Sequence, residues 1–426
     1  MLPRELVGGL VVCMLLLSLV VRSKKPKIPI WSIMAFAAFI VVVTGLVEVD
    51  EIGEVVDIDV ILFLVGMFSI TSLAESSGLL AYVASRFVSA FKTERALIVA
   101  SSLLFGLLAA VAMNDTVALM GPPVAYTIAK ATRVDPKMMF MLLAFSLTIG
   151  SVMTPIGNPQ NVLIATRSGL AAPFVKFVLV LAAPTVLNLA VTPVILMKLY
   201  KHREGPASRL LLIPQEAIRN KRDAALALVG LVASVTALVV NDLFQLAGLP
   251  HIEERGFIPF VVPSAISAVS SEPRKLLAGV DWGTIVFFIS MFIAMEGVWR
   301  SGFLEPLFEL FLPSKPIVDP QVVVALSLLS ILGSQLVSNV PFTKLLILEL
   351  HRVGYTGAHE VVWLTAAMAT TIAGNLTLLG AASNIIIVEY LESRMGTTLS
   401  FTEFLKVGAV VTLVNLLIYI PFLLLL

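Results

Sequence analysis

The sequence contains little charge and almost none of the side chains that bind metals or form disulfides. Only 13% of its 426 residues are charged, whereas soluble globular chains carry about 25%. The single cysteine, Cys13, excludes an internal disulfide, and the 4 histidines form no Cys/His metal cluster. A net charge of +1 offers no basic surface for nucleic acid, and no nucleotide-binding loop of the G-x-x-x-x-G-K-S/T type is present. We therefore expect no cofactor, no nucleic-acid partner and no ATP-driven reaction.

Hydrophobic residues, in contrast, make up 58% of the chain and are grouped in long apolar runs. Many of these runs reach the roughly 20 residues that a helix needs to cross a bilayer. The first run, 7–21, precedes the basic segment 22–27, whereas a signal peptide has its charges before its apolar region. We expect this run to be the first span of an all-α, multi-pass protein of the cytoplasmic membrane, with the lipid bilayer as its surroundings.

Four polar breaks interrupt the apolar pattern. Two read TPIGNPQN (Thr154–Asn161) and TLLGAASN (Thr377–Asn384), which superimpose without a gap and share Thr, Gly and Asn. The other two are MNDT (Met113–Thr116) and SNVP (Ser338–Pro341). Proline removes a backbone donor and disrupts a helix, and a broken helix at membrane depth is tolerated only where protein or a water-filled cavity satisfies the freed backbone. The breaks are therefore candidates for a binding site.

An internal repeat relates the two halves. Asp57–Leu80 and Asp281–Leu304 share eight identities in 24 positions, and Asn114 matches Asn339 at nearly the same offset. Each half has an odd number of crossings, so the second half should be inserted upside down, as in many secondary transporters. We expect two inverted-topology repeats, each with five crossings, a re-entrant helical hairpin and a broken helix. The predicted units are a first repeat at 1–203 (hairpin about 96–131, broken helix about 138–166), a basic cytoplasmic linker at 204–222, and a second repeat at 223–426 (hairpin about 322–350, broken helix about 361–389).

The orientation follows from basic residues, which mark cytoplasmic loops. The basic connection 199–222 is expected in the cytoplasm, with the N-terminus and the C-terminus outside. The interrupted run 96–131 could instead form two full spans, because each arm has about 17 residues, near the short limit for crossing. The amphipathic segments Gly78–Phe91 and Gly302–Leu312 are expected in the interface, where they could be arms of a homodimer.

The breaks also predict which chemistry the site performs. A helix break exposes N–H groups at one half-helix start, which suit an anion, and carbonyls at the other half's end, which suit a cation. Asn and Thr add neutral oxygens for sodium, or donors for a carboxylate or oxyanion. The alternative is that these residues serve only helix packing and interhelical hydrogen bonds. The candidate substrate- and ion-binding residues are Asn114, Asp115, Thr116, Thr154, Gly157, Asn158, Asn161, Ser338, Asn339, Thr377, Gly380, Ser383 and Asn384, with candidate sodium sites at Asn114/Asn158 and Asn339/Asn384.

Two charged residues are candidates for charge coupling. Asp115 is the only carboxylate inside a polar break, where it could bind a cation, take up a proton or merely cap a helix. Lys344 lies five residues after Asn339, where it could replace a bound cation, attract an anion or extend toward the outer surface. Glu75 and Glu296 do not align with each other, and we expect both to be interfacial anchors.

The four breaks resemble the ion-transporter clan that includes arsenite permeases, citrate and divalent-anion carriers and some sodium/proton antiporters. The resemblance covers nearly the whole chain from about Asp57 onward. It implies two inverted repeats, each with a re-entrant hairpin and an unwound helix. In the dicarboxylate branch, Ser-Asn-Thr hairpin turns bind carboxylate, and sodium lies between hairpin turn and broken helix. By position these turns correspond to Met113-Asn114-Asp115 and Ser338-Asn339-Val340; both asparagines match, whereas the first serine and the second threonine are replaced.

Together, these observations predict an ion-coupled secondary active transporter of small anions, either carboxylates or inorganic oxyanions, that works by alternating access with sodium or protons. Efflux of arsenite or antimonite and sodium/proton antiport remain alternatives, and Asp115 favours the antiporter. A passive channel is disfavoured by the inverted repeat. An intramembrane enzyme would need clustered catalytic groups, such as two aspartates or His-Glu-x-x-His, and the apolar runs contain neither.

Overall fold

The computed structural model describes residues 3–24, 28–88, 90–91, 93–132, 134–202, 217–270, 273–395 and 397–426. Within these ranges every regular element is a helix, which confirms the all-α prediction. Most of the predicted linker 204–222 lies outside the described residues, which resume at residue 217.

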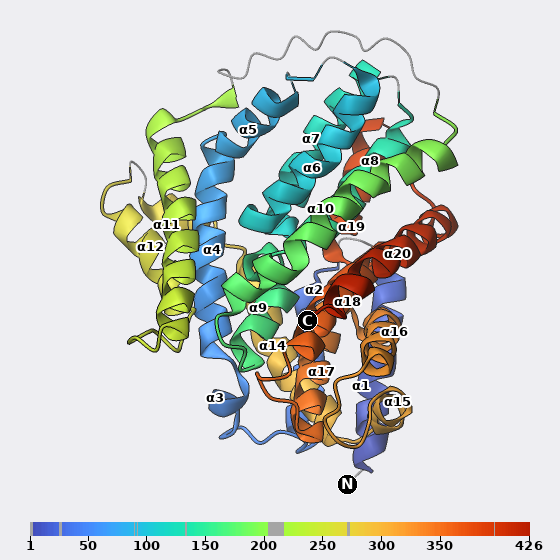
Figure 1. Ribbon diagram of the computed structural model, residues 1–426. Helices are drawn as coiled ribbons and strands as arrows, with labels where there is room; N and C mark the ends of the chain where they lie inside the picture. Colours follow the sequence, from blue (N-terminus) through green and yellow to red (C-terminus); the bar gives the residue numbers. More distant parts are fainter. Residues whose placement is uncertain are drawn as a thin grey trace.

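The helices follow the chain in the order expected from the apolar runs (Figure 1). The first half contains α1 (Arg4–Lys24), α2 (Ile30–Val43), α3 (Ile52–Val55), α4 (Ile58–Ser76), α5 (Leu79–Val88), α6 (Glu94–Ala112), α7 (Asn114–Thr132), α8 (Pro136–Ser151), the 3-10 turn η1 (Pro155–Gly157), α9 (Pro159–Arg167) and α10 (Pro173–Leu199). The second half contains α11 (Lys221–Leu246), α12 (Phe257–Ser267), α13 (Pro273–Ala278), α14 (Trp282–Arg300), α15 (Glu305–Phe311), α16 (Pro320–Val337), α17 (Asn339–Val353), α18 (Glu360–Ile372), η3 (Ala373–Asn375), η4 (Leu378–Gly380), α19 (Ala382–Met395) and α20 (Phe401–Leu423). Both interrupted runs thus become helix pairs, and both TxxG stretches become breaks between two helices.

Seven of the described helices are long and apolar enough to cross a membrane: α4, α6, α10, α11, α14, α16 and α20. The two halves of each broken helix are too short to do so alone, since α8 has 16 residues and α9 has 9. The multi-pass prediction is therefore confirmed for the described part of the chain.

Equivalent positions of the two halves have equivalent local structure. Asp57 and Asp281 both cap the next helix, because each carboxylate accepts a hydrogen bond from the backbone N–H three residues later, at 3.2 and 3.1 Å. Gly78 and Gly302 both follow the capped helix with φ of +82° and +74°, a left-handed conformation that favours glycine. These caps set where α4 and α14 begin and end.

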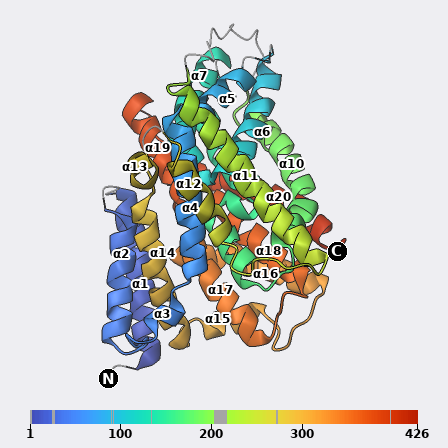
Figure 2. The same cartoon turned by 90° about the vertical axis from the view of Figure 1, so that its left-hand side faces the viewer.

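The turns of the two helix pairs are strained. Met113 joins α6 to α7 with φ of 62°, and Ser338 joins α16 to α17 with φ of 76°. A non-glycine residue in this region costs on the order of 1–3 kcal/mol, so the surrounding packing must hold it there. The pair α6–α7 lies in the upper part of the molecule and α16–α17 in the lower part in both views (Figures 1 and 2).

Helix packing divides the protein into two groups. In the first, α14 packs along α2, and α4 packs against α11 and α12. In the second, α8 packs against α6 and α7, α18 against α16, and α10 against α20. The apolar residues of α8 surround the whole helix, and all residues from Met138 to Ser151 are accordingly buried. The broken helices therefore lie inside the second group, where neighbours can satisfy their freed backbone groups.

Candidate functional site

Both turns and both breaks contribute to one small cavity of about 70 Å³. We call it the tip cavity. It lies against α2 and α14 of the first helix group. Its lining residues are Ile30, Asn114, Asp115, Pro159, Gln160, Thr284, Phe287, Phe288, Ser338, Asn339, Val340 and Ala381.

The N-terminal ends of four helices meet at this cavity. The first residues of α7, α9 and α17 are Asn114, Pro159 and Asn339, and all three line the wall. Ala381, which immediately precedes α19, lines it as well. The first turn of a helix has unpaired N–H groups and a partial positive charge. The backbone dipoles of these ends thus contribute partial positive charge to the cavity, whose described lining includes the Asp115 carboxylate and no basic side chain.

The polar side chains of the two hairpin turns differ in the hydrogen bonds that they already make. Asn114 is buried, and its Oδ1 has no hydrogen-bond partner among the described residues. Asp115 beside it is half-buried. In the other turn, Asn339 Oδ1 accepts a hydrogen bond from the Val340 N–H at 3.1 Å. Thr116 Oγ1 lies 3.5 Å from Thr71 Oγ1 of α4, so its hydroxyl is directed at a neighbouring helix.

The asparagines of the first break are bonded within the protein. Asn158 Nδ2 donates to Ser151 O and Oγ and to Thr371 Oγ1, at 3.2, 2.9 and 3.2 Å. Asn158 Oδ1 accepts from the backbone N–H of Asn161 at 2.9 Å. Asn161 Nδ2 donates to the carbonyls of Ser151 and Thr154 at 2.9 and 3.1 Å. These amides replace the helical hydrogen bonds lost at the end of α8 and hold the break open.

The second break repeats part of this arrangement. Asn384 Nδ2 donates to the carbonyls of Gly374 and Thr377 at 2.8 and 3.2 Å, as Asn161 does at the equivalent carbonyls. Thr377 Oγ1 donates to Gln335 Oε1 at 2.7 Å. In the first break, Thr154 Oγ1 instead donates to the backbone carbonyl of Ala110 at 2.5 Å.

The glycines of both breaks allow close backbone approach. A Cβ on Gly157 would lie 2.3 Å from Ser151 O, and one on Gly380 would lie 2.9 Å from Ala373 O. Both distances are too short for a side chain, so each glycine packs against the end of the preceding half-helix. The two glycines therefore have a packing role, and neither lines the tip cavity.

The structure thus separates the predicted site residues into two sets. Asn114, Asp115, Ser338 and Asn339 line the tip cavity together. The remaining predicted residues are not among its described lining: Thr116, Thr154, Gly157, Asn158, Asn161, Thr377, Gly380, Ser383 and Asn384. The sodium pairings Asn114/Asn158 and Asn339/Asn384 stay predictions, because one member of each pair lines the cavity and the other does not.

Comparisons with known proteins identify the family of this chain. A family model described as a citrate transporter (CitMHS) matches residues 14–373. This chain belongs to the citrate transporter family. The predicted resemblance to the ion-transporter clan is confirmed, as is the prediction that the protein is not an enzyme.

Two relatives and one solved structure are similar to this chain over most of their length. An uncharacterized transporter of Mycobacterium tuberculosis (strain ATCC 25618 / H37Rv) is 28% identical over 381 residues, 85% of this chain and 84% of that protein. The silicon efflux transporter LSI3 of Oryza sativa subsp. japonica is 24% identical over 438 residues, 90% of each chain. The crystal structure of the Alcanivorax borkumensis YdaH transporter matches with a TM-score of 0.55 and 13% identity, over 85% of this chain and 83% of that chain, and supports the fold.

A charged cavity of about 420 Å³ lies one helical turn from the tip cavity in this citrate transporter family member. Both cavities are lined by α9, α14 and α17. Lys344 Nζ lies 3.5 Å from Glu296 Oε2, and Arg300 Nε lies 3.1 Å from Glu296 Oε1. The prediction that Glu296 is an interfacial anchor is therefore wrong, because its buried carboxylate pairs with two cations. Arg167 and Asp57 form a further ion pair at this cavity.

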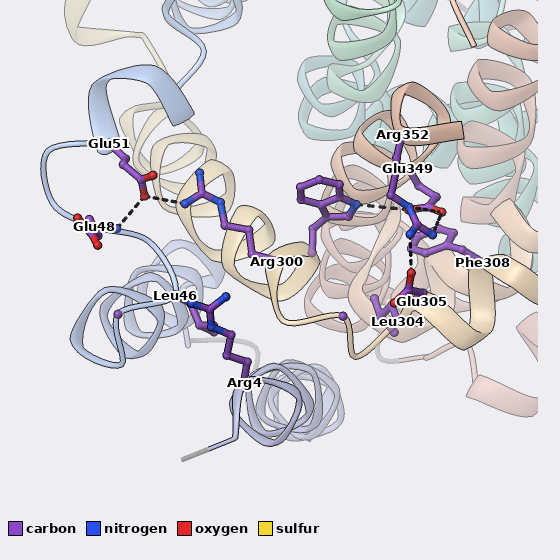
Figure 3. A pocket seen from close by; sticks show the side chains of 13 residues that line it. Arg4, Leu46, Glu48, Glu51, Arg300, Leu304, Glu305, Phe308, Glu349 and Arg352 are labelled. Atoms are coloured by element: carbon purple, nitrogen blue, oxygen red, sulfur yellow. Dashed lines mark hydrogen bonds and ion pairs between the residues drawn. The ribbon is translucent and has the colours of Figure 1, made fainter. Parts of the chain in front are cut away.

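A third cavity, of about 540 Å³, lies near the N-terminus of this family member (Figure 3). Arg300 pairs with Glu51 at 2.6 Å, while Arg352 pairs with Glu349 at 2.7 Å and with Glu305. A hydrogen bond from the Glu48 N–H and the pairing with Arg300 lower the pKa of the Glu51 carboxyl from its ordinary value. The ion pair of Arg352 with Glu305 joins α17 to α15 at this cavity. None of the predicted site residues is among its described lining residues.

Several residues important for the site were missed at first inspection of the sequence. Ser151 and Thr371 accept hydrogen bonds from Asn158, and Gln335 accepts one from Thr377. Thr371 has an identical counterpart, Thr148, at the same offset that superimposes the two breaks. Extending that superposition by six residues toward the N-terminus would have found this pair.

Proposed function

We propose that this protein is an ion-coupled secondary active transporter of small anions, carboxylates or inorganic oxyanions, and that it works by alternating access. The convergence of four helix N-termini on the tip cavity supports this proposal most directly. Unpaired N–H groups and aligned dipoles at such ends favour a negative charge. Asn114 and Asn339 would donate to the substrate from opposite sides of the cavity, one from each hairpin turn.

The proposal includes two inverted repeats with re-entrant hairpins at α6–α7 and α16–α17. Three equivalences support it: the paired helix caps, the two strained non-glycine turns, and the shared carbonyl-bonding pattern of Asn161 and Asn384. The arrangement of these hairpins in opposite parts of the molecule also supports it (Figure 1). In this proposal the 199–222 side faces the cytoplasm, both termini lie outside, and α5 and α15 lie in the interface as arms of a homodimer.

The coupling ion in this proposal is sodium or a proton. Asp115 supports an ion-coupled mechanism, because ionisable residues inside membrane proteins are rare and are functional candidates by default. Its position in the tip cavity would let it exchange a cation or proton as the substrate binds. Lys344, one turn beyond the cavity, would then keep Glu296 neutralised while the substrate passes.

A second candidate is efflux of a small hydroxylated acid, which includes the predicted efflux of arsenite or antimonite. The observation that favours it is the small tip cavity, whose described lining includes one carboxylate and no basic side chain. Such a site would hold a weakly ionised acid by hydrogen bonds. The similarity to a protein named as a silicon efflux transporter points in the same direction.

Uptake into proteoliposomes separates these candidates. The panel is citrate, succinate, sulfate, phosphate, arsenite and silicic acid, each with an imposed sodium gradient, proton gradient or none. Anion uptake that needs a gradient and falls at least tenfold in Asn114→Ala and Asn339→Ala supports the proposal. Asn241→Ala is the matched control, because that amide bonds to Ile252 far from the cavity. Saturable uptake without any gradient dependence would refute ion coupling.

A further inference from the structure

At two of the positions that differ between the breaks, the first break has a polar side chain and the second has none. Superposition of the two breaks pairs Ser151 with Gly374 and Asn158 with Ala381. The first break therefore has a hydroxyl and a carboxamide that the second lacks. In the first break these two groups bond to each other at 2.9 Å, and the carboxamide also bonds to Thr371 at 3.2 Å.

Two buried side-chain oxygens lie around the second break, at the positions equivalent to Thr371 and Asn161 around the first. Thr148 is the counterpart of Thr371, and its Oγ1 has no hydrogen-bond partner among the described residues. Asn384 is the counterpart of Asn161, and its Oδ1 is likewise without a partner there. Asn161 Oδ1, in contrast, accepts a hydrogen bond from Thr371 Oγ1 at 3.1 Å. Such buried polar atoms are uncommon in native proteins, and each requires a physical explanation.

Thr148 and Asn384 both lie against Gly374. Asn384 Nδ2 donates to Gly374 O at 2.8 Å. A Cβ on Gly374 would lie 3.7 Å from Thr148 Oγ1 and 3.1 Å from the Cβ of Ala381. Thr148 and Asn384 are 2% and 1% exposed, and neither lines the tip cavity. The position is thus between the two broken helices, behind the hairpin turns.

The first break shows what kind of group belongs here. Asn158 places its NH₂ group, a donor with partial positive charge, among the oxygens of Ser151 and Thr371. Thr148 lies in the last turn of α8, and Gly374 lies two residues after the end of α18, in η3. Helix C-termini have a partial negative charge and supply carbonyls that coordinate sodium in broken-helix transporters. Neutral hydroxyl, amide and carbonyl oxygens are ligands suited to a hard monovalent cation.

We propose that a sodium ion binds between Thr148 Oγ1 and Asn384 Oδ1, in the place that the Asn158 carboxamide takes in the first break. The two breaks are therefore unequal: one has a built-in donor, and the other takes a cation from solution. The inference rests on the proposed ion coupling and deepens it, because it assigns one coupling ion to this position and none to its counterpart.

Thermal melting of the purified full-length protein in detergent tests the site directly. Melting temperature is measured in sodium chloride against choline chloride at constant ionic strength. We expect a saturable, sodium-specific rise for the wild type and none for Thr148→Val. Thr371→Val is the matched control, since it alters the first break and should keep the sodium response. A wild type without a sodium-specific rise, or a Thr148→Val variant that keeps the full rise, overturns the site.

A substitution that mimics the first break provides a second test. Ala381→Asn places a carboxamide where Asn158 lies in the other half, next to the small Gly374. We expect this variant to melt at the same temperature with and without sodium, and its uptake to lose dependence on a sodium gradient. An unchanged sodium response in Ala381→Asn contradicts the proposal.

The outcomes also distinguish this inference from the proposed function. A sodium-specific melting shift without anion uptake would leave the site intact and refute the transport proposal. Proton-driven anion uptake without a sodium shift would refute the site and leave the transport proposal intact.

Discussion

Removal of Glu296 should destabilise the protein much more than removal of its partner Lys344. Glu296 has two cationic partners, whereas the described residues give Lys344 one ion pair. The Lys344 and Glu296 side chains are 15% and 11% exposed, so water screens them weakly. At an effective dielectric constant near 20, two charges 3.5 Å apart attract by about 5 kcal/mol.

The expected loss in free energy of unfolding depends on which charge each variant leaves unpaired. Glu296→Gln leaves the Lys344 ammonium buried and unpaired, which costs on the order of 3–5 kcal/mol in comparable sites. Lys344→Met leaves Glu296 bonded to Arg300 and should cost about 1–2 kcal/mol. The double variant should lie closer to Lys344→Met than to the sum of the two, because no unpaired cation remains.

Unfolding in mixed micelles of detergent and sodium dodecyl sulfate measures these free energies. Glu305→Gln is the control, since the pair of Glu305 and Arg352 is about half exposed and should contribute at most about 1 kcal/mol. If Lys344→Met proves as damaging as Glu296→Gln, the charge pairing described for this cavity is wrong.

Three further predictions concern the breaks, the α3 region and the tip cavity. Asn161→Ala should lower the free energy of unfolding by about 2–4 kcal/mol and Asn384→Ala by about 1–2 kcal/mol, because Asn161 makes more hydrogen bonds; equal losses in the same unfolding assay would contradict this. The pKa of Glu51 lies below its ordinary value of 4.5, so the stabilisation from its pairing with Arg300 is complete above pH 4.5 and disappears as the pH falls through the lowered pKa. The melting temperatures of wild type and Glu51→Gln should accordingly converge in acid, and a constant difference at all pH values would exclude this effect. Asp115→Asn should reduce gradient-driven uptake at least tenfold and flatten its pH profile, whereas retention of the wild-type profile would remove Asp115 from the coupling step.

The sequence was sufficient to predict the helix order and the position of each break. Apolar runs interrupted by Pro, Gly and Asn report directly on helix length and helix ends, and the breaks MNDT and SNVP coincide with the junctions of α6 with α7 and of α16 with α17. The offset between Asp57 and Asp281 likewise identified two helix starts that share a cap. These features depend on local chemistry, which a single sequence contains.

The sequence did not predict in the same way which polar residues line the cavity and which bond within the protein. Asn158 and Asn339 both occur in polar breaks, yet one is bonded within the protein and the other lines the cavity. The partners that decide this, such as Thr371 for Asn158, are more than 200 residues away in the chain. The ion pair of Glu296 with Lys344 was also missed, since the two residues lie on different helices.

The short halves of the broken helices have a consequence for biogenesis. An insertion machinery that recognises long apolar segments can place α10 or α20 one at a time, but neither α8 nor α9 can span a bilayer alone. The hydrogen bond from Asn158 to Thr371 cannot form until α18 has been synthesised. The tip cavity should therefore be among the last parts of the protein to mature.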